Sequence, residues 1–164
     1  AKLILRMRGY QDECRSMQKR YVPPFVIDMS LLFELYVYHH LYPVSGNSII
    51  YQAAGNYGEA DFIDPKKKLV IDTKYKYTYD NDAYDINDIR QVSGYARDET
   101  ILETLGVADR EIIVPCLIIY PSEKASSDFS ESYDRYWKNR ENRENTIKQF
   151  RKMYKLGIKL PERA

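Results

Sequence analysis

Two aspartates and a lysine stand at the ends of two short, mainly apolar segments. Asp61 lies within residues 58–62, and Asp72 and Lys74 follow the apolar run 69–71. Side chains alternate across a β-strand, so we expect Asp72 and Lys74 on one face of a strand, with Asp61 beside them on the neighbouring strand. Charges in an apolar setting are costly unless they are paired or bind an ion. Carboxylates are hard ligands that suit Mg²⁺, so the pattern predicts a magnesium site, at which Mn²⁺ could substitute.

Such a site would suit hydrolysis of a phosphodiester. The metal ion would activate a water molecule, and Lys74 could orient or deprotonate that water or stabilise charge on the attacked phosphate. An isolated Asp-x-Lys could equally be a surface ion pair on an edge strand, worth at most about 1 kcal/mol. Polar side chains on two predicted helices favour the catalytic reading.

The first of these polar side chains is that of Glu34, which interrupts the apolar segment 31–36 of a predicted helix. It either reaches solvent at a helix boundary or is a further metal ligand that acts through water. Gln91 and Tyr95 are four residues apart and therefore share one helical face. Gln91 could hold a carboxylate or a DNA phosphate, with Tyr95 supporting it.

Arg90 and Arg97 belong to the same predicted helix as Gln91. They are either DNA contacts or ordinary solvent-exposed side chains.

Other metal sites fit less well. His39 and His40 are adjacent and would point in different directions from a helix. The aspartates of segment 80–88 lack the Gly and the final Glu of a calcium-binding EF-hand loop.

The elements that must position these residues alternate between helix and strand. The first half of the chain predicts a helix over 1–20 stopped by Pro23 and Pro24, then a helix with Ser30 as N-cap that ends near Pro43, and then strands over 48–53, 57–63 and 68–76. A polar mobile loop is predicted over 79–88. The second half predicts a helix over 88–105, a strand over 111–120, a loop over 121–132 and a helix over 140–156 ended by Gly157. This order predicts one α/β domain over 1–164, with a mixed central sheet flanked by helices.

Taken together, these residues resemble the PD-(D/E)XK nuclease superfamily. In its pattern a helical Glu precedes an Asp at a strand end, then (D/E)xK on the next strand and often QxxxY. The matching residues here are Glu34, Asp61, Asp72-Thr73-Lys74, and Gln91 with Tyr95. The name-giving Pro, which is not a ligand, is replaced by Ala60. The resemblance implies a restriction-endonuclease-like core, Mg²⁺ held by Asp61, Asp72 and Glu34, and endonucleolytic cleavage of DNA.

The resemblance extends to the McrC family, the endonuclease subunits of McrBC systems that restrict DNA containing modified cytosine. It covers nearly the whole chain, roughly 1–161, and is carried by segments 28–34, 70–76, 88–96 and 156–161. It implies a McrB-like AAA+ GTPase as partner, bound through a segment that usually precedes the nuclease domain and is absent here. The absence of a P-loop motif agrees with GTP being handled by the partner. We therefore expect the C-terminal part of a longer protein, in which 1–24 form a helix and linker.

Composition sets broader limits. Of the 164 residues 44% are hydrophobic and 30% are charged, as in an ordinary globular domain, and the net charge is only +1. No apolar run suits a membrane span, and no signal peptide is recognisable, so no membrane partner is expected. Cys14 and Cys116 have no CxxC neighbour, which favours a reducing cytoplasm and excludes a four-cysteine iron–sulfur cluster.

Two functional hypotheses follow. The first is a DNA phosphodiesterase, for which two copies would have to meet on DNA to cut both strands. The second is a nuclease fold that has become a non-catalytic subunit, which binds DNA or regulates the partner GTPase. The complete set of Asp61, Asp72 and Lys74 favours the first.

Overall fold

The computed structural model describes residues 26–130, 132–133 and 145–161. The helix predicted over 1–20 and Cys14 lie outside the described residues. In chain order the elements are α2 (Met29–Val44), β1 (Ile50–Gly55), β2 (Gly58–Asp64), β3 (Leu69–Thr73), the 3₁₀ helix η1 (Tyr77–Asn81), α3 (Ile86–Tyr95), α4 (Glu99–Thr104), β4 (Cys116–Pro121) and β5 (Met153–Ile158).

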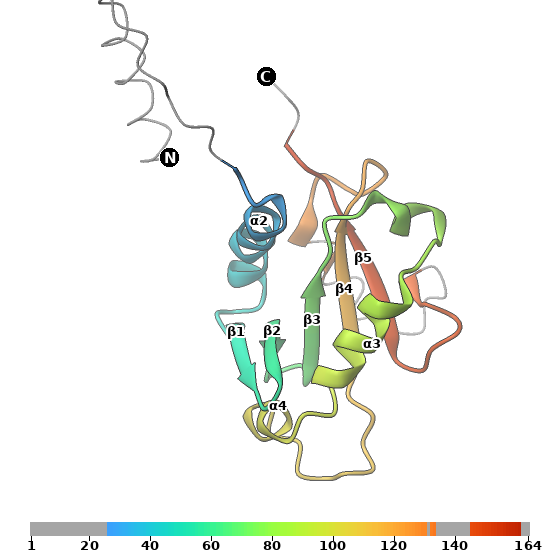
Figure 1. Cartoon of the computed structure of the whole chain (residues 1–164). Coiled ribbons are helices and arrows are strands. Elements are labelled where there is room, and N and C mark those ends of the chain that lie inside the picture. The colour runs from blue at the N-terminus through green and yellow to red at the C-terminus, as the bar shows by residue number, and fades with distance from the viewer. Residues whose placement is uncertain (1–25, 131, 134–144, 162–164) are drawn as a thin grey trace, which may run out of the picture.

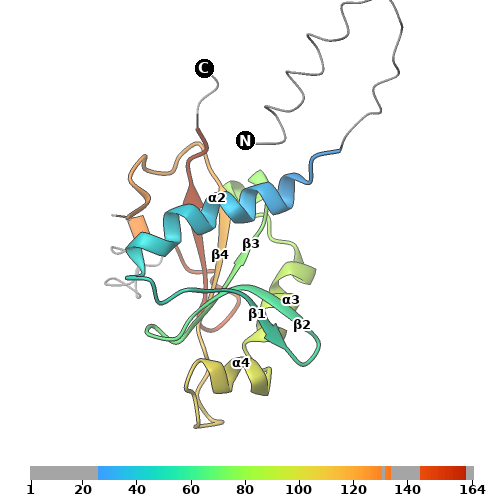
Figure 2. The ribbon, with the colours of Figure 1, turned by 90° about the vertical axis from the view of Figure 1, so that its left-hand side faces the viewer.

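The five strands form one mixed sheet in the order β1-β2-β3-β4-β5. The pairs β1–β2 and β2–β3 are antiparallel, whereas β3–β4 and β4–β5 are parallel. Helices α2 and α3 lie on opposite sides of the sheet (Figures 1 and 2). The prediction of an α/β domain with a mixed central sheet flanked by helices is therefore confirmed.

Each face of the sheet has its own core. Beneath α2, the helix residues Phe33, Val37 and Leu41 pack with sheet residues that include Ile71. On the other face, Ile89 and Val92 of α3 pack with sheet residues that include Val70. Because Val70 faces α3, alternation along β3 also directs Asp72 towards α3. The sheet thus places the Asp72 side chain on the side that α3 covers.

The start of α2 differs from the prediction. Its N-cap is Asp28, not Ser30, because the Asp28 carboxylate accepts hydrogen bonds from the backbone N–H groups of Ser30 at 2.9 Å and Leu31 at 3.1 Å. Such a cap satisfies N–H groups that have no partner within the helix. Pro43 lies inside the last turn, and the helix ends at Val44.

The single helix predicted over 88–105 is two helices. α3 ends at Tyr95, and Asp98 begins α4 by accepting hydrogen bonds from the N–H groups of Thr100 and Ile101. The predicted loop over 79–88 contains the end of η1 and the start of α3. The strand predicted over 111–120 begins only at Cys116.

The prediction of a helix over 140–156 is wrong for the part that the structure describes. Residues 145–152 are mainly turns and bends, and Met153–Ile158 form β5, paired in parallel with β4; residues 140–144 lie outside the described residues. Helix-favouring Met, Lys and Leu residues are outweighed here by sheet pairing and burial on both faces. Gly157 accordingly lies within a strand and is not a helix C′ residue.

The packing at Gly157 gives a stability prediction. A Cβ atom at this position would lie 2.7 Å from Ser122 Cβ, closer than real Cβ contacts allow. We expect Gly157→Ala to lower the free energy of unfolding by about 1–3 kcal/mol, because a well-packed site must shift to accept the methyl group. Urea denaturation would measure this loss. In a Ser122→Gly background the same substitution should cost much less, and an equal cost there would contradict the close packing.

Candidate functional site

The candidate site begins where β2 and β3 part. Their pairing ends at Phe62 and Ile71. Just beyond, Asp61 Oδ2 accepts hydrogen bonds from Thr73 N at 2.7 Å and from Thr73 Oγ1 at 2.6 Å. A side-chain carboxylate thus takes the place of a ladder carbonyl, which holds Asp61 beside the end of β3.

We call the point where β2 and β3 diverge the fork. Asp72 is the most deeply buried charged side chain there. Its side chain is 0% exposed, and its Oδ2 lies 2.7 Å from Lys74 Nζ. Neither carboxylate oxygen receives a hydrogen bond from any other described residue. Burial raises the pKa of Asp72 to about 7; Lys74 opposes this shift and the nearby Asp61 carboxylate adds to it. Asp72 is therefore a buried acid with unused acceptor capacity.

Lys74 is held between Asp72 and the Gln91 side chain of α3. Its Nζ donates to Gln91 Oε1 at 3.0 Å, and Gln91 Nε2 donates to Tyr95 Oη at 3.0 Å. Burial is the largest effect and disfavours the ammonium group, but the carboxylates of Asp72, Asp61 and Asp88 together outweigh it, so the pKa of Lys74 is raised. The lysine therefore serves as a fixed cation. Gln91 and Tyr95 share the expected helical face, although Gln91 contacts the lysine and not a carboxylate.

Glu34 approaches the fork from α2. It is half-buried, and its Oε1 accepts a hydrogen bond from Gln52 Nε2 at 3.4 Å. Burial and the charge of Asp61 raise the pKa of Glu34. Gln52 has a left-handed backbone with φ of 49°, and it lies between the β1 residues that pair with Phe62 and Ala60. This local distortion of β1 was not foreseen from the sequence, and it brings a polar side chain between Glu34 and the sheet.

The fit of these residues to a metal ion rests on donor chemistry. Within the described ranges, no three or more side chains of His, Cys, Asp or Glu are grouped closely enough to hold a metal ion by themselves. The buried Asp72 carboxylate without other hydrogen-bond donors nevertheless suits a cation. Mg²⁺ is commonly held by one or two carboxylates and keeps several waters. Asp72 and Asp61 could therefore hold it, with Glu34 acting through water.

A second polar network adjoins the site and was missed by the sequence reasoning. Lys76 Nζ lies 2.9 Å from Asp85 and 2.8 Å from Asp88, and Tyr79 Oη donates to Asp88 at 2.9 Å. The Asp88 charge also acts on Asp72. One signal was available: Lys76 continues the two-residue period of Asp72 and Lys74.

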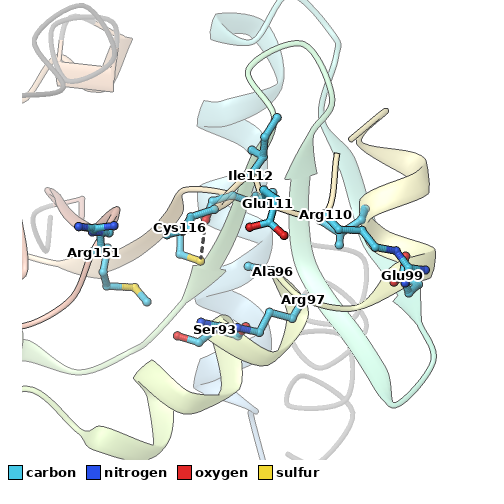
Figure 3. Close-up of a pocket in the computed structure, with 13 residues that line it drawn as sticks. Ser93, Ala96, Arg97, Glu99, Arg110, Glu111, Ile112, Cys116 and Arg151 are labelled. Carbon is cyan, nitrogen blue, oxygen red and sulfur yellow. Dashed lines mark hydrogen bonds and ion pairs between the residues drawn. The ribbon is translucent and has the colours of Figure 1, made fainter. Parts of the chain in front are cut away.

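Arg90 and Arg97 are exposed. Both line a hollow of about 630 Å³ that also includes Gln91 and Tyr95. A second hollow, of about 300 Å³, shares Arg97 with the first and is shown in Figure 3. Cys116 lines this second hollow; it is buried, as expected for a core residue, and burial raises the pKa of its thiol to about 12.

Comparisons with known proteins identify no relative: no family model, curated protein or solved structure matches this chain. Among the described residues, no helix has the length and apolar character needed to cross a membrane. Function must therefore be argued from the site itself.

Proposed function

We propose that this chain is a metal-dependent DNA endonuclease domain with a restriction-endonuclease-like core of the PD-(D/E)XK type. The observation that carries the proposal is the fork between β2 and β3. There, the buried Asp72 carboxylate lies 2.7 Å from Lys74, and Asp61 is fixed beside them through Thr73. A buried carboxylate that receives so few hydrogen bonds is costly to keep for stability alone. Its cost is explained if it binds a cation.

In this mechanism Asp72 and Asp61 would hold Mg²⁺ or Mn²⁺, and Glu34 would orient a water molecule. The ion supplies activation of a water nucleophile and neutralisation of phosphate charge. Lys74, fixed by Gln91, donates hydrogen bonds to the attacking water or to the non-bridging phosphate oxygens. Tyr95 keeps the Gln91 amide in the orientation that accepts from the lysine.

The wider setting proposed for this domain comes from its resemblance to the McrC family. In that setting the domain cuts DNA in the cytoplasm, while a McrB-like AAA+ GTPase selects modified DNA. One such site hydrolyses one strand, so double-strand cleavage would require two copies on the DNA.

Plasmid nicking tests the proposed function directly. We expect the chain to convert supercoiled plasmid to the open circle in Mn²⁺ or Mg²⁺, and to lose this activity in EDTA. An Asp72→Ala variant purified in parallel should be inactive, which also excludes a contaminating nuclease. Nicking that persists in EDTA or in this variant would refute the proposed site. If the wild type fails to cut even with a McrB-like GTPase, the non-catalytic hypothesis replaces this one.

A further inference from the structure

The hollow of about 630 Å³ lies between the turn of the β1–β2 hairpin and α3. Asn56 and Tyr57 line it from the hairpin turn. Gln91 and Tyr95 line it from α3, and these are the residues that hold Lys74. Only the Gln91 side chain therefore separates the hollow from the candidate catalytic Lys74. The proposed hydrolysis gives the hollow no role.

The hairpin turn is fixed in place by Asp98. The two Asp98 carboxylate oxygens accept hydrogen bonds from Asn56 N at 2.7 Å and Asn56 Nδ2 at 3.0 Å. The next residue, Tyr57, is 99% exposed. An aromatic ring on a fixed turn can stack on a nucleobase, and such stacking tolerates any base. Tyr57 is thus placed like a stacking platform at the mouth of the hollow.

The charges that line the hollow favour an anion. Arg90 makes no hydrogen bond or ion pair with any described residue, and Arg97 donates from Nη1 to Ser93 O at 2.8 Å, which leaves its other N–H groups available. The two acidic residues of the lining are engaged elsewhere. Asp98 binds the hairpin turn and caps α4, and Glu99 pairs with Arg110 at 3.0 Å. Guanidinium groups without carboxylate partners suit phosphate oxygens.

Gly94 is an independent sign that the hollow is kept open. It lies in α3 and lines the hollow, although glycine is unfavourable inside a helix. No atom lies within 4 Å of a Cβ built there, so packing does not require glycine. A longer side chain at position 94 would instead occupy the hollow.

We propose that this hollow is a subsite for one unpaired nucleotide of the DNA strand next to the cleaved phosphate. Tyr57 stacks on its base, and Arg90 and Arg97 bind the phosphates on either side of it. The position beside the cleaved bond rests on the proposed nuclease function. The binding of a single strand rests on the hollow itself.

Fluorescence anisotropy with a labelled single-stranded oligonucleotide, measured on the whole chain in EDTA, tests the subsite. We expect Gly94→Leu and Tyr57→Ala each to raise Kd by roughly tenfold, since one base stack contributes about 5- to 150-fold to affinity. Arg90→Ala should reduce the slope of log Kd against log salt by about 0.7, as expected for one lost phosphate contact with a single strand.

Matched controls separate binding from folding. Gly94→Leu should keep or raise the thermal midpoint, because leucine favours helix where glycine does not. Tyr42→Ala and Lys148→Ala remove a tyrosine and an exposed cation outside the hollow, and should leave Kd within about twofold. Unchanged affinity in Gly94→Leu or Tyr57→Ala would overturn the subsite.

The two proposals fail in different ways. If the chain binds the oligonucleotide and the variants weaken it, but Mn²⁺ gives no cutting even with the GTPase, the subsite stands and the nuclease proposal fails. If the chain cuts DNA while Gly94→Leu and Tyr57→Ala leave Kd and KM unchanged, the nuclease proposal stands and the subsite fails.

Discussion

Asp72→Asn should abolish metal-dependent cleavage and at the same time raise the thermal stability of the metal-free protein. The loss of activity should be on the order of 1000-fold, because a bound metal ion contributes several kcal/mol to the transition state. The gain in stability has a separate cause. Asp72 is fully buried and has no hydrogen-bond donor besides Lys74 among the described residues, so its charge is costly, and an amide of the same shape removes that charge.

The gain in stability depends on pH in a defined direction. The pKa of Asp72 is raised from 3.8 to about 7, so between these values the folded protein holds a proton that the unfolded chain has released. Wild-type stability should therefore fall as pH rises through this window, and the full cost should remain above pH 7. The advantage of Asp72→Asn should be small near pH 4 and largest above pH 7. Thermal melts in EDTA at several pH values would measure it.

A buried aspartate elsewhere supplies the control. Asp64 is also fully buried, but its Oδ1 accepts hydrogen bonds from Ser48 Oγ at 2.9 Å and Lys67 N at 3.2 Å. Asp64→Asn should therefore lower the thermal midpoint, because it weakens charge-assisted hydrogen bonds. Mn²⁺ should raise the midpoint of wild type and of Asp64→Asn, but not that of Asp72→Asn. A fall in stability of Asp72→Asn, or an equal metal effect in all three, would contradict the role given to Asp72.

Local patterns predicted much of the sheet that carries the site. The alternation through Asp72, Thr73 and Lys74 placed the two charges on one face of a strand, and the structure places both on the face that α3 covers. The two strands β1 and β2 were also predicted, with boundaries shifted by one or two residues. These features depend on residues close together in sequence, so they can be read from it.

Features that depend on distant residues were not predicted. β5 reads locally as a helix and becomes a strand only because it pairs with β4. The fork at Asp61 arises because its side chain replaces a ladder partner of Thr73, which no spacing rule reveals. The break between α3 and α4 was visible in principle, since Asp98 is a good N-cap, but the helical periodicity of 88–105 masked it.

Lys74→Met should reduce the rate of DNA cleavage by about 100- to 1000-fold, the usual cost of losing a group that stabilises transition-state charge. Methionine keeps most of the aliphatic stem and removes the cation that contacts Asp72 and Gln91. We expect kcat to fall while KM for DNA changes little, because a fixed lysine beside the reacting phosphate acts mainly in the transition state. Single-turnover cleavage of a labelled duplex in Mn²⁺ would separate the two.

Lys76→Met is the matched control for Lys74→Met. Lys76 lies two residues after Lys74 and is paired with Asp85 and Asp88. Its replacement by methionine therefore removes the same positive charge from a neighbouring position that is not paired with Asp72. Its effect on kcat should stay below about tenfold, as expected for loss of a partly exposed ion pair outside the reacting centre. Equal losses in the two variants would mean that Lys74 contributes only general positive charge. A fully active Lys74→Met protein would refute its catalytic role, since the proposed chemistry depends on this one ammonium group beside the metal ligands.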